Sequence, residues 1–233
     1  MKKALILLSL LVTLVGCNNG SRLSSDDNKI YYGETPVGTF LPVESDAIAY
    51  DDQMEFLDDN TLKITRTFTA LQDIDSIRLT LNFRHESECQ SAMIPSVSYD
   101  GNHWGKGKEP KGFQTDGVWH TYSYRRTPIP GATYSEGKDF AVAMWGTNPT
   151  NEAEAFSCSL MPEETEVTHS LILPEEERPF IYSGRDSYKD GFACKLSMRK
   201  GETRKMEAYL SVSPKSDNSY PIATFLDKAW ELA

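Results

Sequence analysis

The chain has 233 residues, of which 39% are hydrophobic and 25% charged, and its 34 acidic side chains outnumber 24 basic ones, giving a net charge of −10. This apolar content excludes a disordered tail or a collagen-like repeat. No basic cluster exceeds two residues, and the acidic balance argues against a nucleic-acid partner, because phosphate backbones would be repelled. The length suits one large β domain or two small ones.

The N-terminus has the features of an export signal. Lys2 and Lys3 precede an apolar run over residues 4–15, which is too short for a mature transmembrane helix and has the length of a signal-peptide core. The sequence Leu-Val-Gly-Cys that ends at Cys17 is similar to a bacterial lipobox. We therefore expect residues 1–16 to be removed and the cysteine to be lipidated, which anchors the protein in the outer membrane, on its cell-surface or its periplasmic side. A plain secretory signal with a chance cysteine is the alternative.

Residues 17–29 are rich in Asn, Gly, Ser and Asp and contain a single leucine. Such a segment buries too little apolar surface to fold. We expect it to be a flexible tether between the lipid and the folded domain.

Much of the remaining chain alternates between apolar and polar side chains, which is the period of a half-buried strand. The alternation is found at residues 62–70, 77–83, 156–160, 167–173, 192–198 and 206–212. Arg66 is the only interruption on the apolar face of the first segment, and residues 140–145 are apolar throughout, as in a strand buried on both faces. We therefore expect an all-β fold, an antiparallel β-sandwich of about eight to twelve strands over residues 30–214.

Residues 215–233 are expected to form a linker and a short amphipathic helix. Ser219 is placed to cap a helix that begins near Pro221. The apolar side chains that recur at helical spacing are Ile222, Phe225, Leu226, Ala229 and Trp230. Two interpretations remain: the helix docks on the sandwich, or it opens a helical domain that lies beyond residue 233.

The stronger catalytic and cofactor motifs are absent from the sequence. It contains no Gly-rich phosphate loop, His-Glu-x-x-His, EF-hand loop, Cys-x-x-Cys or Gly-x-Ser-x-Gly, so we expect no cofactor and no metal. The cluster His85, Glu86, Glu88 and Cys89 lacks the spaced partners of a zinc site. Among 34 acidic residues, no pair of carboxylates for glycoside hydrolysis can be singled out, so the catalytic residues are unknown.

Three further residues lie on apolar strand faces. Cys158 and Cys194 could form a disulfide there or pack as small hydrophobic groups, and packing is favoured. His169 is expected to be a hydrogen-bonded histidine of the core.

A turn-rich loop that begins at Asp100-Gly101 carries several aromatic side chains. An aromatic face stacks on a sugar ring while nearby polar groups bind the hydroxyls. The candidate carbohydrate-binding residues of this loop are Tyr99, Asn102, His103 and Trp104. Arg125 or Arg126 would bind the carboxylate of an acidic sugar. The alternative is that the aromatic side chains fold back over the edge of the sandwich.

The chain resembles the N-terminal β-sandwich that precedes an (α/α) toroid in secreted polysaccharide-degrading proteins of Bacteroidetes, the six-hairpin glycosidase type. The resemblance covers nearly all of residues 30–233. It is carried by residues 99–105 (Tyr-Asp-Gly-Asn-His-Trp-Gly), Arg126 with residues 129–131 (Ile-Pro-Gly), residues 135–137 (Ser-Glu-Gly) and the helix of residues 225–230. It implies a glycoside hydrolase or lyase as parent protein, with the catalytic carboxylates mainly in the toroid, and it transfers no catalytic residue to this chain.

Three functions follow as hypotheses. The first is a lipid-anchored, non-catalytic β-sandwich module of a polysaccharide-degrading protein, with a glycan as ligand and a helical catalytic domain beyond residue 233. The second is a complete, stand-alone carbohydrate-binding lipoprotein. The third is a β-sandwich lyase or hydrolase that uses His103 or His120 with Tyr122 or Tyr124 as acid and base.

Overall fold

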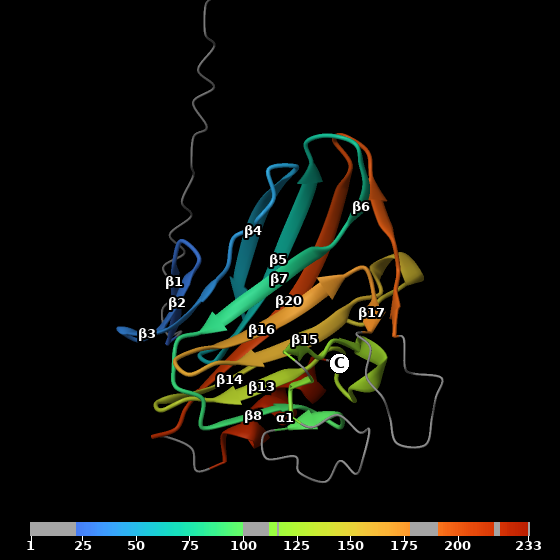
Figure 1. The fold of residues 1–233 in the computed structure, drawn as a ribbon. Coiled ribbons are helices and arrows are strands. Elements are labelled where there is room, and N and C mark those ends of the chain that lie inside the picture. Colours follow the sequence, from blue (N-terminus) through green and yellow to red (C-terminus); the bar gives the residue numbers. More distant parts are fainter. Residues whose placement is uncertain (1–21, 100–111, 116, 178–190, 217–219, 233) are drawn as a thin grey trace, which may run out of the picture.

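The computed structural model describes residues 22–99, 112–115, 117–177, 191–216 and 220–232. Within these ranges, two antiparallel sheets of seven strands each pack face to face (Figure 1). The expected all-β sandwich with one C-terminal helix is therefore confirmed.

The strands of each sheet follow one another in space in an order that differs from the chain order. Sheet A contains β1 (Leu23–Asp26), β2 (Lys29–Tyr32), β3 (Thr35–Phe40), β7 (Leu79–His85), β16 (Val167–Leu173), β15 (Ser157–Pro162) and β12 (Tyr122–Ser123). Sheet B contains β4 (Ile48–Phe56), β5 (Thr61–Ala70), β20 (Thr203–Pro214), β14 (Phe140–Gly146), β13 (Thr133–Glu136), β8 (Ser91–Ile94) and β9 (Ser98–Tyr99). Three two-stranded pairs join β10 (Gln114–Thr115) to β11 (Val118–Trp119), β17 (Glu176–Glu177) to β18 (Phe192–Ala193), and β6 (Ile74–Ile77) to β19 (Leu196–Met198).

The number of strands exceeds the eight to twelve expected from the sequence. The long central strands are the ones whose alternation is visible in the sequence. Most of the additional strands, such as β8 and β12, have two to four residues, which is too short for a period of two to stand out. Strand β4 was also missed although it has nine residues, because Asp51 and Asp52 interrupt its alternation.

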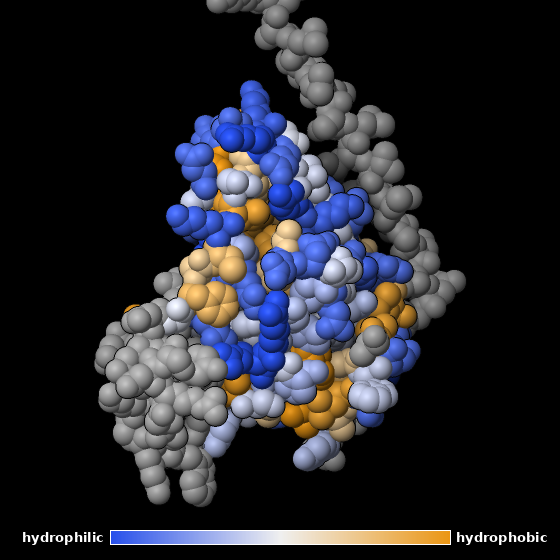
Figure 2. Space-filling model, turned by 90° about the vertical axis from the view of Figure 1, so that its right-hand side faces the viewer, coloured by the Kyte–Doolittle hydropathy of each residue, from blue (hydrophilic) through white to orange (hydrophobic). Residues whose placement is uncertain are grey.

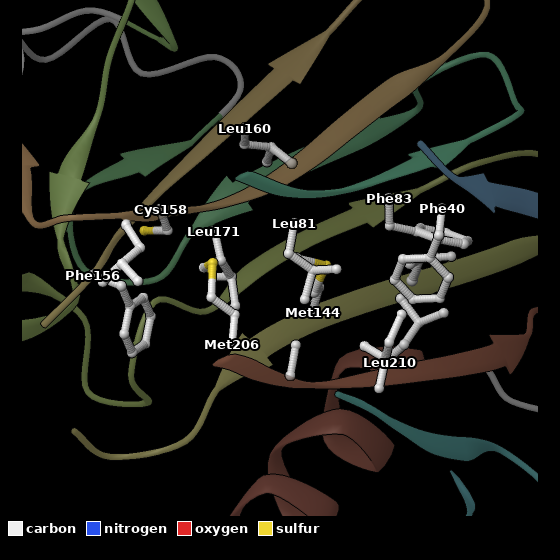
Figure 3. Close-up of a cluster of buried hydrophobic side chains, with 14 of the residues drawn as sticks. Phe40, Leu81, Phe83, Met144, Phe156, Cys158, Leu160, Leu171, Met206 and Leu210 are labelled. Atoms are coloured by element: carbon white, nitrogen blue, oxygen red, sulfur yellow. The ribbon is translucent and has the colours of Figure 1, made fainter. Parts of the chain in front are cut away.

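The main core lies between the two sheets and is made of the inward side chains of the alternating strands. Figure 3 shows Leu81 and Leu171 of sheet A pointing toward Met144 and Met206 of sheet B. All four side chains are buried. Burying one such side chain contributes about 1.5–3 kcal/mol, so this row of contacts is the main force that holds the sheets together.

Arg66, the charged residue on the inner face of β5, is fully buried. Its Nε and Nη2 atoms donate to the two carboxylate oxygens of Asp52 at 2.7 and 2.6 Å, and Nη1 donates to the Leu41 carbonyl at 2.9 Å. The Tyr50 ring centre lies 4.7 Å from the guanidinium carbon. The sheet tolerates a charge here because each guanidinium nitrogen has an acceptor.

Strand β14 is buried on both faces, as its continuous apolar sequence predicted. Phe140, Val142 and Met144 belong to the main core. Trp145 and its outward neighbours belong to a second, smaller core on the outer face of sheet B, under helix α1 (Pro221–Glu231).

Helix α1 docks on the outer face of sheet B through one edge of its apolar stripe. Phe225 and Ala229 are buried, and the Phe225 ring centre lies 5.3 Å from that of Trp145. Leu226 and Trp230 are 43% and 87% exposed. The apolar stripe is therefore docked on the sheet through Ile222, Phe225 and Ala229. Its other two members, Leu226 and Trp230, face away from the sheet. No helix in the described part of the chain is long and apolar enough to cross a membrane.

Two expectations about local structure are wrong. The segment expected to be a tether contains β1, which pairs with β2 and buries Leu23. Its backbone hydrogen bonds do not depend on apolar composition, which is why the composition failed to show it. The alternation expected over residues 192–198 is split between β18 and β19, so Phe192 and Cys194 are exposed. Cys158 is a buried thiol of the core, and it forms no disulfide with Cys194.

Candidate functional site

A groove of about 570 Å³ lies between α1 and the nearby end of sheet B. We call it the α1 groove. Its volume falls in the range of known small-molecule sites, about 300–1,000 Å³. The lining residues are Tyr124 and Arg125 of the 3-10 turn η1 (Tyr124–Arg126), residues 127–130, residues 145–148 at the end of β14, Tyr209 of β20, Leu226, Ala229 and Trp230 of α1, and Leu232.

The η1 turn and the loop after it are held in shape by hydroxyl groups. The Arg125 amide donates to the Ser123 hydroxyl at 3.2 Å, which caps the turn at its start. The Thr127 hydroxyl donates to the Tyr124 carbonyl at 3.0 Å and accepts from the Gly131 amide at 2.9 Å. These bonds fix the wall of the groove that carries Tyr124 and Arg125.

Two glycines next to the groove leave room for the ring of Phe156. A Cβ atom on Gly146 would lie 2.4 Å from Cζ of Phe156, and one on Gly131, whose φ is +62°, would lie 2.5 Å from Cε2 of the same ring. The Gly146 amide also donates to the Pro130 carbonyl at 2.9 Å. A side chain at either position would therefore collide with the Phe156 ring, on which Tyr124 of the groove wall stacks.

The aromatic side chains of the α1 groove differ in how much surface they present. Trp145 is buried, with its ring centre 5.4 Å from that of Tyr209. The Tyr124 ring stacks on Phe156, with ring centres 5.3 Å apart. Trp230 is almost fully exposed, so it is the aromatic group of the groove with most surface left for a ligand.

The two arginines predicted to bind an acidic sugar have different surroundings. Glu177 binds Arg126 in a bidentate ion pair, with nitrogen–oxygen distances of 2.6 and 3.0 Å. Arg125 is 59% exposed, and its Nε lies 3.2 Å from the Tyr124 hydroxyl and 3.7 Å from Glu175. The hydrogen bond to Tyr124 and the charge of Glu175 raise the pKa of Arg125, so the guanidinium at the groove stays charged.

Two buried carboxylates anchor η1 from the side of sheet A. Glu175 and Glu177 both accept from Ser123, the first from its hydroxyl and the second from its amide at 3.4 Å. Their role could not be recognised in the sequence, because a run of glutamates is usually a solvated surface segment. They position the turn, and they do not line the groove.

The structure brings only part of the sequence-predicted site to the α1 groove. Arg125 lines it, whereas Arg126 does not. Tyr99 lies in β9, 42% exposed, and is not part of the lining. The other three predicted ligands lie outside the described residues: Asn102, His103 and Trp104. These three remain predictions, as does the lipidated Cys17, which also lies outside the described residues. Ser219 lies outside them too, but the N-cap position of α1 is the next residue, Tyr220, which makes no side-chain cap hydrogen bond, so the expected serine cap is wrong.

Sequence reasoning missed Trp230 and Tyr209 as candidate site residues. Trp230 belongs to the apolar stripe of α1, and periodicity alone does not show which edge of a stripe is covered. Tyr209 occupies an outward position of β20. The one feature of the sequence that could have indicated Tyr209 is its position, since it is an aromatic residue on the otherwise polar face of the strand.

The acid and base pair considered for a sandwich enzyme, His120 and Tyr122, is buried. The Tyr122 hydroxyl lies 3.3 Å from Nδ1 of the His120 ring, and burial lowers the pKa of this histidine. Both side chains are at most 2% exposed, so a polysaccharide would not reach them. Of the described residues of that hypothesis, Tyr124 alone lines the α1 groove, and His103 lies outside the described residues.

His169 is a hydrogen-bonded core histidine, as predicted. Its ring nitrogens lie 2.9 Å from the Thr133 hydroxyl and 2.8 Å from the Ser135 hydroxyl, and Ser135 also lies 3.0 Å from Nδ1 of His85. Burial lowers the pKa of His169 to about 3 and that of His85 to about 4. In the described residues, no group of three or more His, Cys, Asp or Glu side chains is placed to hold a metal ion.

Comparisons with known proteins give little that can be transferred. No protein-family model matches the sequence, and no curated protein matches it. Among solved structures, the chain is similar to that of a candidate aldose 1-epimerase from Escherichia coli K12, with 14% sequence identity and a TM-score of 0.33, over 82% of this chain and 67% of that one. A likeness at this level says nothing about the function of this chain.

Proposed function

We propose that the chain is a lipid-anchored, non-catalytic β-sandwich module of a polysaccharide-degrading protein, and that the α1 groove forms one wall of a glycan-binding cleft. The observation that carries this proposal is the exposed Trp230 ring at a groove that also presents the charged Arg125. An aromatic face suits the C–H face of a sugar ring, and a guanidinium donates to hydroxyl or carboxylate oxygens.

The remaining lining supports a polar, ring-shaped ligand. Thr147 and Asn148 lie at the groove and make no side-chain hydrogen bond in the part of the chain that the structure describes, so they can bind hydroxyl groups. Figure 2 shows hydrophobic residues gathered in separate areas of an otherwise hydrophilic face. The lining of the groove itself combines the polar Thr147 and Asn148 with the exposed Trp230 ring, which fits the polar and apolar surfaces of a sugar.

The absence of acids from the lining supports binding over hydrolysis. Glycoside hydrolysis requires two carboxyl groups on opposite sides of the scissile bond. The described lining of the α1 groove contains neither Asp nor Glu. Any catalytic carboxylates would then come from outside the α1 groove.

A second candidate function is contact with a helical domain. Leu226 and Trp230 are one helical turn apart and form an exposed apolar edge of α1. The same surface could then pack against a second polypeptide unit. The two candidates differ in whether the isolated chain binds a glycan.

The test is a glycan array with the purified chain, followed by calorimetry with each glycan that binds. We expect Trp230→Ala to weaken binding about tenfold, which corresponds to about 1.4 kcal/mol. Arg125→Gln should weaken it as well. The matched control is Tyr220→Ala, because Tyr220 is a 68% exposed aromatic residue at the other end of α1 and does not line the groove.

Three outcomes would contradict the proposal. Binding that is unaffected by Trp230→Ala but lost with Trp104→Ala would move the site to the predicted aromatic loop. Binding to no glycan at all would favour the helical-domain contact. Turnover of a polysaccharide that His103→Ala abolishes would restore the enzyme hypothesis.

A further inference from the structure

A second hollow, of about 320 Å³, lies next to the α1 groove. We call it the edge hollow. It is lined by residues 203–207 of β20, residues 147–150, Ala153, Glu154, and the apolar side chains of Phe156, Leu171 and Leu173. It shares Thr147 and Asn148 with the α1 groove, so one short segment separates the two hollows.

In the part of the chain that the structure describes, the edge hollow lies along a part of β20 that has a neighbouring strand on one side only. Pairing between β14 and β20 ends where Gly146 lies opposite Ala208. Beyond that point β20 continues to Thr203, paired with β5 alone. A strand edge of this kind presents unpaired backbone N–H and C=O groups.

The register shows which backbone groups face the free side. The Lys215 amide donates to the Asp139 carbonyl at 2.9 Å, so this odd-numbered position faces the β14 side. Backbone groups alternate in direction along a strand, and Thr203, Lys205 and Glu207 therefore also point to that side. These residues line the edge hollow. The Thr203 carbonyl accepts from Nη1 of Arg204 at 3.1 Å, so Lys205 and Glu207 are the positions whose backbone groups face the hollow for a ligand.

The side chains around this edge suit a polyhydroxylated ligand. The Lys205 ammonium is exposed and has no partner in the described part of the chain. Glu154 accepts from the Thr150 amide and hydroxyl at 2.9 and 2.8 Å, which orders the loop on the other side of the hollow. A lysine in the middle of a free edge is a common device against pairing with another strand, and this disfavours an added peptide strand.

We propose that the edge hollow is a second subsite for the glycan of the α1 groove, so that the ligand is an oligosaccharide chain laid along β20 and not a single sugar. This inference rests on the proposed function. Lys205 and Tyr209 are four residues apart on β20, about 13 Å at a rise of about 3.3 Å per residue. That span exceeds one sugar ring. The Lys205 ammonium and the backbone groups of Lys205 and Glu207 that face the free side would bind hydroxyls.

The test measures how affinity depends on ligand length. The probes are the disaccharide and the hexasaccharide of four series: cello-, xylo- and manno-oligosaccharides and oligogalacturonides. We expect the hexasaccharide of the bound series to bind at least tenfold more tightly than its disaccharide. Lys205→Ala should remove most of this advantage and leave the disaccharide affinity unchanged. Lys200→Ala, an exposed lysine outside both hollows, is the matched control.

A second variant tests whether the ligand occupies the edge hollow. Ala153→Trp places a large side chain at an exposed position of the edge hollow and should likewise weaken only the hexasaccharide. Equal affinity for short and long ligands, with both weakened by Trp230→Ala, would overturn the second subsite and leave the proposed function standing. Equal weakening of both lengths by Lys205→Ala would also overturn it. No binding at either length would overturn the function and the subsite together.

Discussion

Arg66 and Asp52 form a buried ion pair between two strands of sheet B, with 1% and 7% of their side-chain surfaces exposed. A buried pair adds little stability compared with two apolar residues, but the loss of one partner leaves an uncompensated charge in the core. A neutral side chain at position 52 or 66 alone would therefore destabilise β4 and β5, because the other charge would stay buried without a partner.

We predict that Asp52→Ala lowers the free energy of unfolding by about 3–5 kcal/mol, because the Arg66 guanidinium would stay buried without its counter-ion. The measurement is urea unfolding followed by circular dichroism. The matched control is Asp73→Ala, which removes an exposed ion pair with Arg199 and a hydrogen bond from the Lys200 amide and should lower the free energy of unfolding by no more than about 1 kcal/mol. Equal loss of stability in the two variants would contradict the prediction.

The buried histidines make stability depend on pH. Burial holds the pKa of His169 at about 3 and that of His85 at about 4, both below the ordinary 6.5 of the unfolded chain. The unfolded chain therefore binds protons below pH 6.5 that the folded chain does not. Their contribution to stability is complete above pH 6.5 and is lost as the pH falls toward 4 and then 3. His120 acts in the same direction.

The expected result is a steady fall of the urea midpoint between about pH 6.5 and pH 5, a window in which few carboxylates titrate. His169→Gln should reduce the slope in this window, since one titrating group is removed. A flat profile from pH 7 to pH 5 in the native chain would show that the histidines are not held neutral.

The two edges of α1 have separate roles. The inner edge packs Phe225 between Trp145 and Tyr134, with ring centres 5.3 and 6.2 Å away. The outer edge leaves Trp230 at the groove. Stability and ligand binding should therefore respond to different residues of one helix.

We predict that Phe225→Ala lowers the free energy of unfolding by about 3–5 kcal/mol, because it leaves a cavity under the helix. Trp230→Ala should change it by less than about 0.5 kcal/mol, as for other exposed positions. Chemical denaturation of both variants tests this. If Trp230→Ala were as destabilising as Phe225→Ala, its effect on glycan binding could not be assigned to a lost contact with the ligand.

The whole molecule, in our proposal, is held at a membrane by a lipid on Cys17. We predict that cells given labelled palmitate incorporate the label into the native chain and not into Cys17→Ser. The matched control is Cys194→Ser, which removes an exposed thiol of the folded domain and should keep the label. Labelling of Cys17→Ser would exclude this anchor.

Sequence patterns predicted the long elements well. The alternation over residues 167–173 corresponds to β16, and the continuous apolar run from Phe140 corresponds to β14. Strands of two to four residues were missed, because their pairing depends on backbone hydrogen bonds with neighbours far along the chain. The nine-residue β4 was missed as well, because Asp52, the buried partner of Arg66, interrupts its apolar face. The alternation around Cys194 predicted one continuous strand, but the structure has two short strands there, β18 and β19. The period of the side chains does not show where a strand stops pairing with its neighbour.

The sequence by itself determined the fold class, because an apolar period of two leaves few ways to bury the strand faces other than two packed sheets. It also determined that one helix follows the sheets and that His169 belongs to the core. Only the tertiary structure decided which edge of that helix is covered, that Arg126 is held by Glu177 while Arg125 lies at the α1 groove, and where β20 loses its neighbour. These properties depend on contacts between residues that are distant in the chain. The local period of apolar residues does not predict such contacts.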